Sequence, residues 1–157
     1  MSLKTNARGL CLVLSRKTRK ILCGFATMPP TRVAIVDDDQ SVRTAIGRVL
    51  KTSQIEVDAF ATSIELFNAI ERSPPNCIVL DLQMPGMDGV DVMRFLAECG
   101  VHIPTIVITA HDEPATRNRC LGAGAAAYLR KPLDADELLK TIDDVIARTK
   151  PVGPMSN

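Results

Sequence analysis

A chain of 157 residues, 46% hydrophobic, 24% charged and with a formal net charge of +1, supports one ordinary domain with a hydrophobic core. No apolar run approaches the ~18–20 residues of a membrane span. Residues 1–30 carry 6 basic and no acidic side chains, whereas residues 31–157 carry 13 basic and 18 acidic ones, a balance that argues against a nucleic-acid surface on the second part.

Residues 1–30 precede the regular pattern. The apolar run at 10–14 is shorter than the hydrophobic region of a secretory signal, and a basic cluster at 16–20 follows it. We interpret residues 1–30 as a basic extension, disordered or loosely docked. The alternatives are an amphipathic segment that touches anionic lipid or RNA, and a natural start at Met28.

From residue 31 to residue 89, strand and helix patterns alternate. Apolar runs predict buried strands at 33–36 and 76–81, and an alternating pattern predicts a strand near a sheet edge at 55–60. Helical spacing of apolar residues predicts helices at 42–50 and 62–70. Asp39 is expected to cap the first helix, and the Thr62-x-x-Glu65 pattern is a capping box for the second.

The same alternation continues to the end of the chain. It predicts a helix at 90–97, a strand at 103–109, a helix from 112 to 122 or 124, a strand at 125–129 and a helix at 134–146. Pro114 lies in the first turn of its helix, and Asp134 with Glu137 forms a second capping box.

Five strands that alternate with five helices predict an α/β fold with a parallel sheet covered on both faces. The expected architecture is a flavodoxin-like (βα)5 doubly wound sheet with strand order 2-1-3-4-5. The expected organisation is an extension at 1–30, one domain at 31–148 and a tail at 149–157.

The five cysteines show no C-x-x-C spacing and no paired framework. We expect them to be small apolar side chains in a reducing compartment rather than metal or redox centres. They are Cys11, Cys23, Cys77, Cys99 and Cys120.

Polar residues follow four of the five predicted strands, at the edge where the carboxyl ends of parallel strands meet. Asp37 and Asp38 follow the first strand, Asp81 ends the third, Thr109 ends the fourth and Lys131 follows the fifth. Clustered carboxylates repel unless a cation neutralises them, and oxygen ligands suit Mg²⁺. Such a site is suited to a phosphoryl group, with Asp81 as nucleophile. Each residue alone has a simpler explanation, as a cap, a strand residue or a solvated charge.

These residues together resemble the receiver domain of bacterial two-component response regulators, over residues 31–148. The resemblance is carried by four segments in the right order and spacing. They are Val-Asp-Asp-Asp at 36–39, Asp81 followed by Met-Pro-Gly-Met-Asp-Gly at 84–89, Thr-Ala at 109–110 and Tyr-Leu-Arg-Lys-Pro at 128–132.

The resemblance implies that Asp81 is the phosphoacceptor for a phosphoryl group from a histidine of a partner protein. It implies that Asp38 binds Mg²⁺, or Mn²⁺, directly and that Asp37 binds it mainly through water. Asp81 itself and the backbone carbonyl of Gln83 complete the implied set of ligands.

The resemblance also assigns roles to five residues after the fourth and fifth strands. Lys131 is expected to pair with the phosphoryl oxygens, and Pro132 to follow a cis peptide bond. Thr109 is expected to hydrogen-bond the phosphoryl group, with a small Ala110 admitting it, and Tyr128 to be an aromatic switch residue.

Gln83 and His111 depart from the commonest residues of this family at their positions. Each lies two residues after a site residue, at the mouth of the site, where the family's side chains influence hydrolysis of the phosphoryl group. We therefore expect them to tune dephosphorylation; the alternative for His111 is an ordinary loop histidine exposed to solvent.

The implied function is a stand-alone, phosphorylation-controlled signalling switch in the bacterial cytoplasm, with self-catalysed phosphorylation and dephosphorylation but no separate enzyme domain. The expected partners are a sensor histidine kinase or histidine phosphotransfer protein, and a downstream protein or second copy. The downstream protein or second copy would bind the face formed by the helix at 112–122, the strand at 125–129 and the helix at 134–146. Direct DNA binding is not expected.

Three rival functions fit the sequence less well. An aspartyl-phosphate phosphatase or transferase requires a second acidic side chain at the position of Gln83. A nucleotide or flavin binder would carry a glycine-rich phosphate motif, which the sequence lacks. A phosphorylation-independent interaction module would be expected to lack one of the site residues, and all are present.

Overall fold

The structure, a computed structural model, describes residues 4–5, 11–12 and 29–149. The chain divides into two compact units, Met1–Pro30 and Thr31–Asn157. In the first unit β1 (Lys4–Thr5) pairs antiparallel with β2 (Cys11–Leu12), a pairing that the sequence did not predict. The rest of the expected basic extension, and the tail after residue 149, lie outside the described residues.

The second unit contains a five-stranded sheet in which every pair of neighbouring strands is parallel. The order across the sheet is β4-β3-β5-β6-β7, which is 2-1-3-4-5 when the strands of this unit are counted along the chain, as predicted. The strands are β3 (Arg32–Val36), β4 (Glu56–Phe60), β5 (Cys77–Asp81), β6 (Thr105–Thr109) and β7 (Ala127–Arg130).

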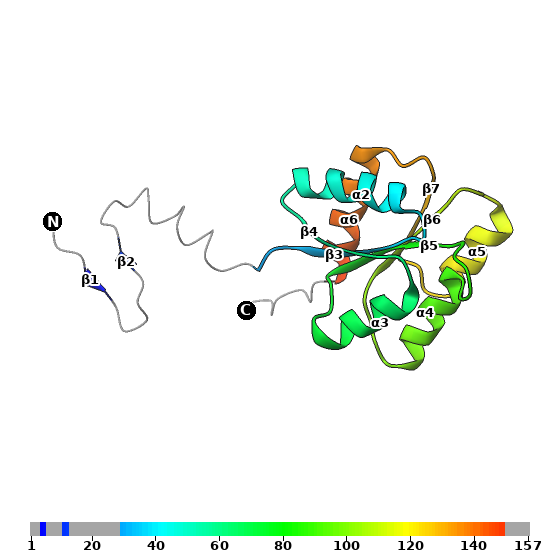
Figure 1. Ribbon diagram of the computed structural model, residues 1–157, viewed down its shortest axis with the longest axis horizontal. Coiled ribbons are helices and arrows are strands. Elements are labelled where there is room, and N and C mark those ends of the chain that lie inside the picture. The colour runs from blue at the N-terminus through cyan, green and yellow to red at the C-terminus, as the bar shows by residue number, and fades with distance from the viewer. Residues whose placement is uncertain (1–3, 6–10, 13–28, 150–157) are drawn as a thin grey trace, which may run out of the picture. The chain divides into compact units, whose positions relative to one another are not determined.

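Helices cover both faces of this sheet (Figure 1). On one face lie α2 and α6, and on the other lie α3, α4 and α5. The helices are α2 (Gln40–Thr52), α3 (Ser63–Arg72), α4 (Gly89–Glu98), α5 (Pro114–Gly122) and α6 (Ala135–Thr149). The predicted doubly wound α/β fold is confirmed.

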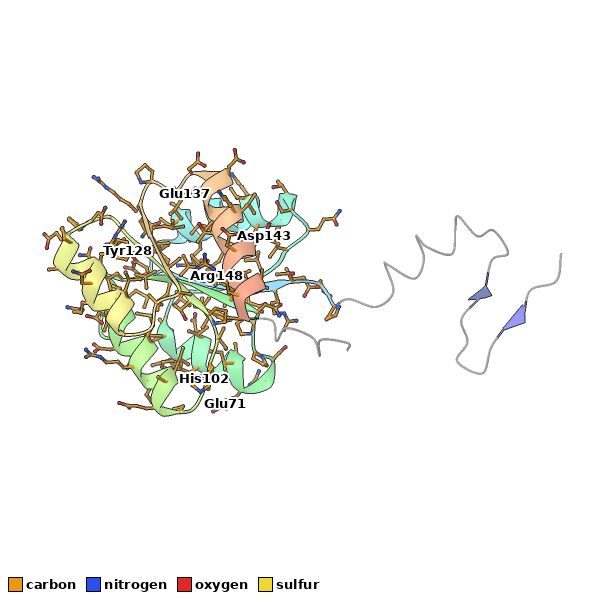
Figure 2. The ribbon with its side chains drawn as sticks, turned by 180° about the vertical axis from the view of Figure 1, so that it is seen from behind. Glu71, His102, Tyr128, Glu137, Asp143 and Arg148 are labelled. Atoms are coloured by element: carbon orange, nitrogen blue, oxygen red, sulfur yellow. The ribbon has the colours of Figure 1, made fainter. Side chains whose placement is uncertain are left out.

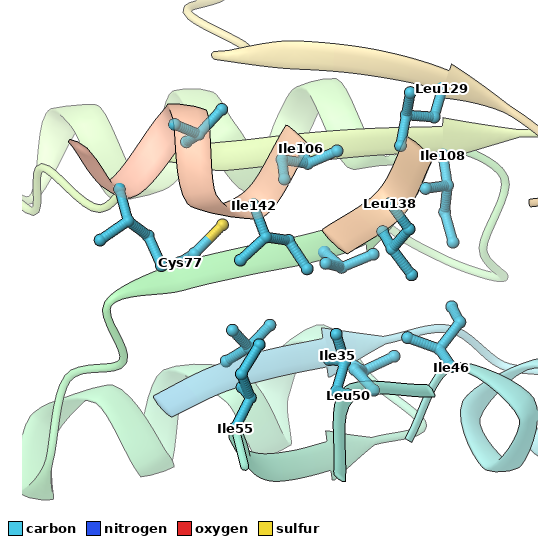
Figure 3. Packing of buried hydrophobic residues seen from close by; sticks show 14 residues of the cluster. Ile35, Ile46, Leu50, Ile55, Cys77, Ile106, Ile108, Leu129, Leu138 and Ile142 are labelled. Carbon is cyan, nitrogen blue, oxygen red and sulfur yellow. The ribbon is translucent and has the colours of Figure 1, made fainter. Parts of the chain in front are cut away.

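Two hydrophobic cores flank the sheet because successive side chains of a strand point to opposite faces. In β5, Cys77 and Val79 belong to the core under α2 and α6, whereas Ile78 and Leu80 belong to the core under the other three helices. Figure 3 shows the first core, with Ile142 of α6 close to the central strand. A central strand buried on both faces explains its continuous apolar run.

Side-chain hydrogen bonds confirm the predicted caps of α2 and α3, whereas α5 begins without a side-chain cap. Asp39 Oδ1 accepts from the Ser41 N–H at 2.8 Å, and Thr62 Oγ1 accepts from the Glu65 N–H at 3.3 Å. Glu65 completes its capping box one residue early, because its Oε2 accepts from the Ala61 N–H at 2.8 Å and not from Thr62.

Two strands begin two residues later than predicted. In β6, Pro104 contributes its carbonyl to the Ile78 N–H, but it has no N–H of its own, and the ladder starts at Thr105. Before β7, the Ala125 N–H closes the end of α5 by donating to the Cys120 carbonyl, after Gly124 at a φ of +98°. Gly124 and Ala125 therefore terminate α5 and do not belong to β7.

Candidate functional site

The carboxyl ends of the strands bring the predicted residues together although they lie far apart in the sequence. Val36 of β3 is in register with Leu80 of β5, so Asp37 and Asp81 lie at the same edge. Asp37 and Thr109 have no solvent-exposed surface, and Asp81 is 4% exposed. Three polar side chains are thus buried at one edge of the sheet, where each requires a partner.

Three carboxylates form an acidic cluster at this edge. Asp37, Asp38 and Asp81 each offer an oxygen within 4.8 Å of the other two. Burial, and secondly the charge of Asp37, raise the pKa of the Asp81 carboxyl, while Lys131 and the Gln83 backbone oppose this shift. A set of oxygen donors that repel one another fits a hard divalent cation such as Mg²⁺.

Lys131 is the cation that this cluster already contains. Its Nζ lies 2.7 Å from Asp37 Oδ2 and 3.2 Å from Asp81 Oδ1. Burial lowers the pKa of the ammonium group, but the bonds and charges of Asp37 and Asp81 outweigh burial and raise it overall. The Lys131 N–H donates to the Thr109 carbonyl at 2.7 Å, and the Lys131–Pro132 peptide bond is cis.

Backbone contacts fix the first member of the cluster. Asp37 Oδ1 accepts from the Asp39 N–H at 2.9 Å, and the Asp37 carbonyl accepts from Arg43 Nη1 at 2.6 Å. Arg43 was not identified from the sequence, because nothing in the helical pattern of α2 indicates that this arginine reaches back to the preceding strand.

The loop after β5 packs tightly against Asp81. A Cβ atom on Gly89 would lie 2.9 Å from the Asp81 carbonyl oxygen and 3.1 Å from Leu82 Cα, so only glycine fits there. Asp88, the residue before it, caps α4 with Oδ1 and pairs through Oδ2 with Arg119 Nη2 of α5 at 2.5 Å. The loop is therefore held at Asp81 on one side and at α5 on the other.

A cleft of about 610 Å³ opens beside this loop. The exposed Gln83 lines it together with residues from three segments of the chain. These are Asp38, Leu82, Met84, Pro85, Asp88, Thr116 and Arg119. Arg119 was not found by sequence reasoning, because its role depends on where α5 packs.

The Thr109 hydroxyl hydrogen-bonds the backbone of His111 and not the Asp81 carboxylate. It donates to the His111 carbonyl and accepts from the His111 N–H, both at 3.2 Å, and the Tyr128 hydroxyl donates to the same carbonyl at 3.2 Å. Burial, followed by the charge of Asp112, raises the pKa of Tyr128. The backbone of His111 thus joins Thr109 to Tyr128, while its side chain and that of Ala110 are exposed.

Comparison with known proteins identifies the domain. Residues 33–143 match the family described as the response regulator receiver domain. The chain belongs to this family. The family membership confirms the resemblance, and with it the function class of a receiver in two-component signalling. A receiver domain is not in itself an enzyme family.

Among curated relatives, the receiver is 38% identical to the response regulator MprA of Mycobacterium sp. strain KMS over 128 residues, which are 81% of this chain and 56% of MprA. It is also 38% identical to MprA of Mycobacterium leprae over 120 residues, 76% of this chain and 53% of that protein. The chain therefore spans about half the length of these curated relatives.

Solved receivers have the same fold. The Francisella response regulator 1452 receiver domain is 27% identical with a TM-score of 0.72, covering 76% of this chain and 99% of that one. The receiver of NarL from Mycobacterium tuberculosis is 30% identical with a TM-score of 0.71, covering 76% and 98%. A receiver protein from Burkholderia phymatum is 41% identical with a TM-score of 0.67, covering 74% and 95%.

Another structural neighbour, from Staphylococcus aureus, is described as a DNA-binding response regulator of the LuxR family. It is 27% identical with a TM-score of 0.68, and the match covers 74% of this chain and 98% of that one. The expectation that the present chain does not bind DNA directly therefore stays a prediction. Within the described part of the chain, no helix is both long and apolar enough to cross a membrane.

Proposed function

We propose that this receiver is switched by phosphorylation of Asp81, with the phosphoryl group supplied by a phosphohistidine of a sensor kinase or phosphotransfer protein. The observation that carries the proposal is the position of the Asp81 carboxylate. It is buried, it lies 3.2 Å from Lys131 Nζ, and it shares a cluster with Asp37 and Asp38.

In the proposed reaction a carboxylate oxygen of Asp81 attacks the phosphorus atom, and the bond from phosphorus to the imidazole nitrogen breaks. The electron pair of that bond returns to the imidazole, and Asp81 becomes an acyl phosphate. Lys131 would pair with an oxygen of the incoming group, a role supported by the 3.2 Å distance from its Nζ to Asp81 Oδ1. Charge neutralisation of this kind supplies most of the catalysis in phosphoryl transfer.

The acidic cluster is the proposed Mg²⁺ site, which could also hold Mn²⁺. Asp38 would bind the metal directly, Asp37 mainly through water, and Asp81 with the carbonyl of Gln83 would complete the set. When bound, the metal ion would neutralise the charge that builds up on the phosphoryl oxygens. Asp37 and Asp81 are buried and Asp38 is exposed, so the site is open to solvent on one side.

Loss of the phosphoryl group would occur by attack of water on phosphorus, with the bond to the Asp81 oxygen breaking. The exposed side chains of Gln83 and His111 lie on loops that follow Asp81 and Thr109, where they can influence access of that water. We expect His111→Ala to change the half-life of the phosphorylated protein. An unchanged half-life would refute a tuning role for His111.

The output of the switch is proposed to be a change at the face formed by α5, β7 and α6. In the phosphorylated protein, Thr109 would hydrogen-bond the phosphoryl group, and Tyr128 would respond to that movement. A downstream protein, or a second copy of this chain, would recognise the altered face. We propose protein docking, without direct DNA binding, as the way in which the signal is passed on.

The proposal is tested by incubating the protein with Mg²⁺ and acetyl phosphate, which donates a phosphoryl group without a partner protein. Wild type is expected to gain acid-labile phosphate, and Asp81→Asn none. Asp38→Asn is expected to need more Mg²⁺ for the same extent of labelling. The proposed function is refuted if wild type gains no phosphate or if Asp81→Asn gains as much as wild type.

A further inference from the structure

Tyr128 is held in a buried position by two separate contacts. It is the only tyrosine of the chain, and 9% of it is exposed. Its hydroxyl donates to the His111 carbonyl at 3.2 Å, and its ring lies under the guanidinium of Arg117, with Arg117 Cζ 5.1 Å from the ring centroid. Figure 2 shows Tyr128 beside α5, the helix that carries Arg117.

The hydroxyl contact links Tyr128 to Thr109 through one acceptor. The His111 carbonyl accepts hydrogen bonds from both Thr109 Oγ1 and the Tyr128 hydroxyl. Thr109 has a single hydroxyl proton, so turning it toward a phosphoryl group on Asp81 withdraws one donor from this carbonyl. Tyr128 in its buried position keeps the carbonyl hydrogen-bonded, and the turn of Thr109 then leaves no acceptor without a partner.

The ring contact depends on Arg117 and its surroundings. A guanidinium within about 6 Å of an aromatic centroid is attracted to the face of the ring. Arg117 Nε also lies 3.8 Å from Asp112 Oδ1, in the loop that follows β6, which restrains the direction of the arginine. The charge of Asp112 raises the pKa of Tyr128 and that of Arg117 lowers it, as expected for charges that face the same ring.

We propose that Arg117 is a positioning residue of the switch. It holds Tyr128 in the buried position and thereby favours the turn of the Thr109 hydroxyl toward a phosphoryl group on Asp81. This inference rests on the proposed function, since it concerns how easily the phosphorylated state forms. It goes further by assigning a role to an arginine that lies outside the acidic cluster.

The expected size of the effect follows from the exposure of Arg117. The arginine side chain is 50% exposed, so its attraction to the ring is at the weak end of such contacts. Removing it is expected to shift the balance between buried and exposed Tyr128 by about two- to fivefold. Because coupling between two equilibria is reciprocal, the tendency to form the aspartyl phosphate falls by up to the same factor.

The chain offers a direct measurement of the Tyr128 position. With one tyrosine and no tryptophan, its intrinsic fluorescence comes from Tyr128 alone. Quenching by acrylamide is measured for wild type, Arg117→Gln and Arg117→Lys, with and without Mg²⁺ and subsaturating acetyl phosphate, and phosphate on Asp81 is measured in parallel. Arg94→Gln, which removes an exposed arginine of α4, is the matched control.

In Arg117→Gln, Tyr128 is expected to be more accessible to acrylamide before phosphorylation, and the phosphorylated fraction is expected to fall by a factor of up to about five. Phosphorylation should bury Tyr128 again in this variant. Arg117→Lys, which keeps the positive charge, should recover part of both effects, and Arg94→Gln should match wild type. A merely structural role of Arg117 would not predict reburial on phosphorylation or recovery by lysine.

Two results would overturn the inference while leaving the proposed function intact. One is equal quenching of wild type and Arg117→Gln; the other is increased quenching with an unchanged phosphorylated fraction. If wild type itself gains no phosphate, the proposed function fails and the coupling fails with it. Circular dichroism of each variant establishes that the quenching is compared between folded proteins.

Discussion

The surroundings of the Asp81 carboxylate disfavour its ionised form. Its carboxylate is buried beside the buried carboxylate of Asp37, and Lys131 is shared between the two. Burial and the neighbouring charge raise its pKa despite this lysine, which means that the ionised form is less favourable in the folded chain than in the unfolded chain. A site of this kind is poised to bind a cation, because binding relieves the repulsion.

Replacing Asp81 by Asn is therefore expected to stabilise the metal-free protein near neutral pH. A carboxyl whose pKa is raised on folding lowers stability when it is ionised, so stability decreases as the pH rises through the folded-state pKa. The gain from Asp81→Asn should be complete above that pKa and should disappear as the pH falls toward 3.8, the ordinary value. Thermal unfolding of both proteins across this pH range in a chelator measures the difference.

Adding Mg²⁺ should reverse the order of the two proteins or reduce the gap between them. A cation that binds only the folded state raises stability according to its affinity, and Asp81→Asn removes one of its proposed ligands. A variant that is less stable than wild type in chelator at pH 7 would contradict this account of the Asp81 charge.

For single residues, the sequence was enough to predict which side chains lie at the carboxyl ends of the strands. It was not enough to predict the contacts that loops and helices make with one another. The positions of Asp37, Asp81, Thr109 and Lys131 follow from the parallel sheet alone. The contacts of Arg117 and Arg119 do not follow, because they depend on how α5 packs. Those of the His111 carbonyl depend on the conformation of the loop after β6. A long arginine side chain on an exposed helical position has no periodic signature.

Among the elements, every predicted helix and strand of the second unit starts within two residues of its observed start. Side chains of Asp39, Thr62 and Asp134 cap helices within a few residues of themselves, and such local contacts are readable from sequence. The predicted starts of β6 and β7 were two residues too early, because Pro104 and the end of α5 alter the backbone pairing there. Hydrogen bonds between segments distant in the sequence therefore determine where these two strands begin.

Asp88 gives a prediction at the scale of a single helix. Its Oδ1 accepts from the Asp91 N–H at 2.9 Å to cap α4, while Oδ2 pairs with Arg119. Asp88→Ala removes both contacts and should cost about 1 kcal/mol or somewhat more. Asp88→Asn keeps the cap and loses only a half-exposed ion pair, which should cost less than about 1 kcal/mol. Urea unfolding of the two variants separates these contributions.

Arg119→Gln is the complementary variant for Asp88, because it removes the ion pair and leaves the cap. Its cost should match that of Asp88→Asn. If Asp88→Asn were as damaging as Asp88→Ala, the ion pair to α5 and not the helix cap would be the main contribution of Asp88.

In the whole molecule, the acidic cluster and its lysine come together only when the sheet is complete. Asp37 and Lys131 are separated by 94 positions in the sequence, and their side chains meet because strands from both ends of the domain lie in one sheet. Both hydrophobic cores that hold this sheet are built from residues between Val33 and Ile146. The site residues and the cores thus belong to the same compact unit, Thr31–Asn157.

A chain that begins at Met28 is therefore expected to retain the full activity of the site. It keeps every strand of the sheet, both cores and all the site residues between Asp37 and Lys131, and it loses the 6 basic side chains of residues 1–30. The midpoint of thermal unfolding, its increase with Mg²⁺ and the labelling by acetyl phosphate should equal those of the full chain.

Measuring labelling at low and at high salt tests the electrostatic contribution of the extension, since attraction of an anionic phosphodonor by exposed basic residues is screened by salt. A shortened chain that melts at a lower temperature, or that is labelled more slowly at both salt concentrations, would show that residues before Met28 contribute to the folded domain.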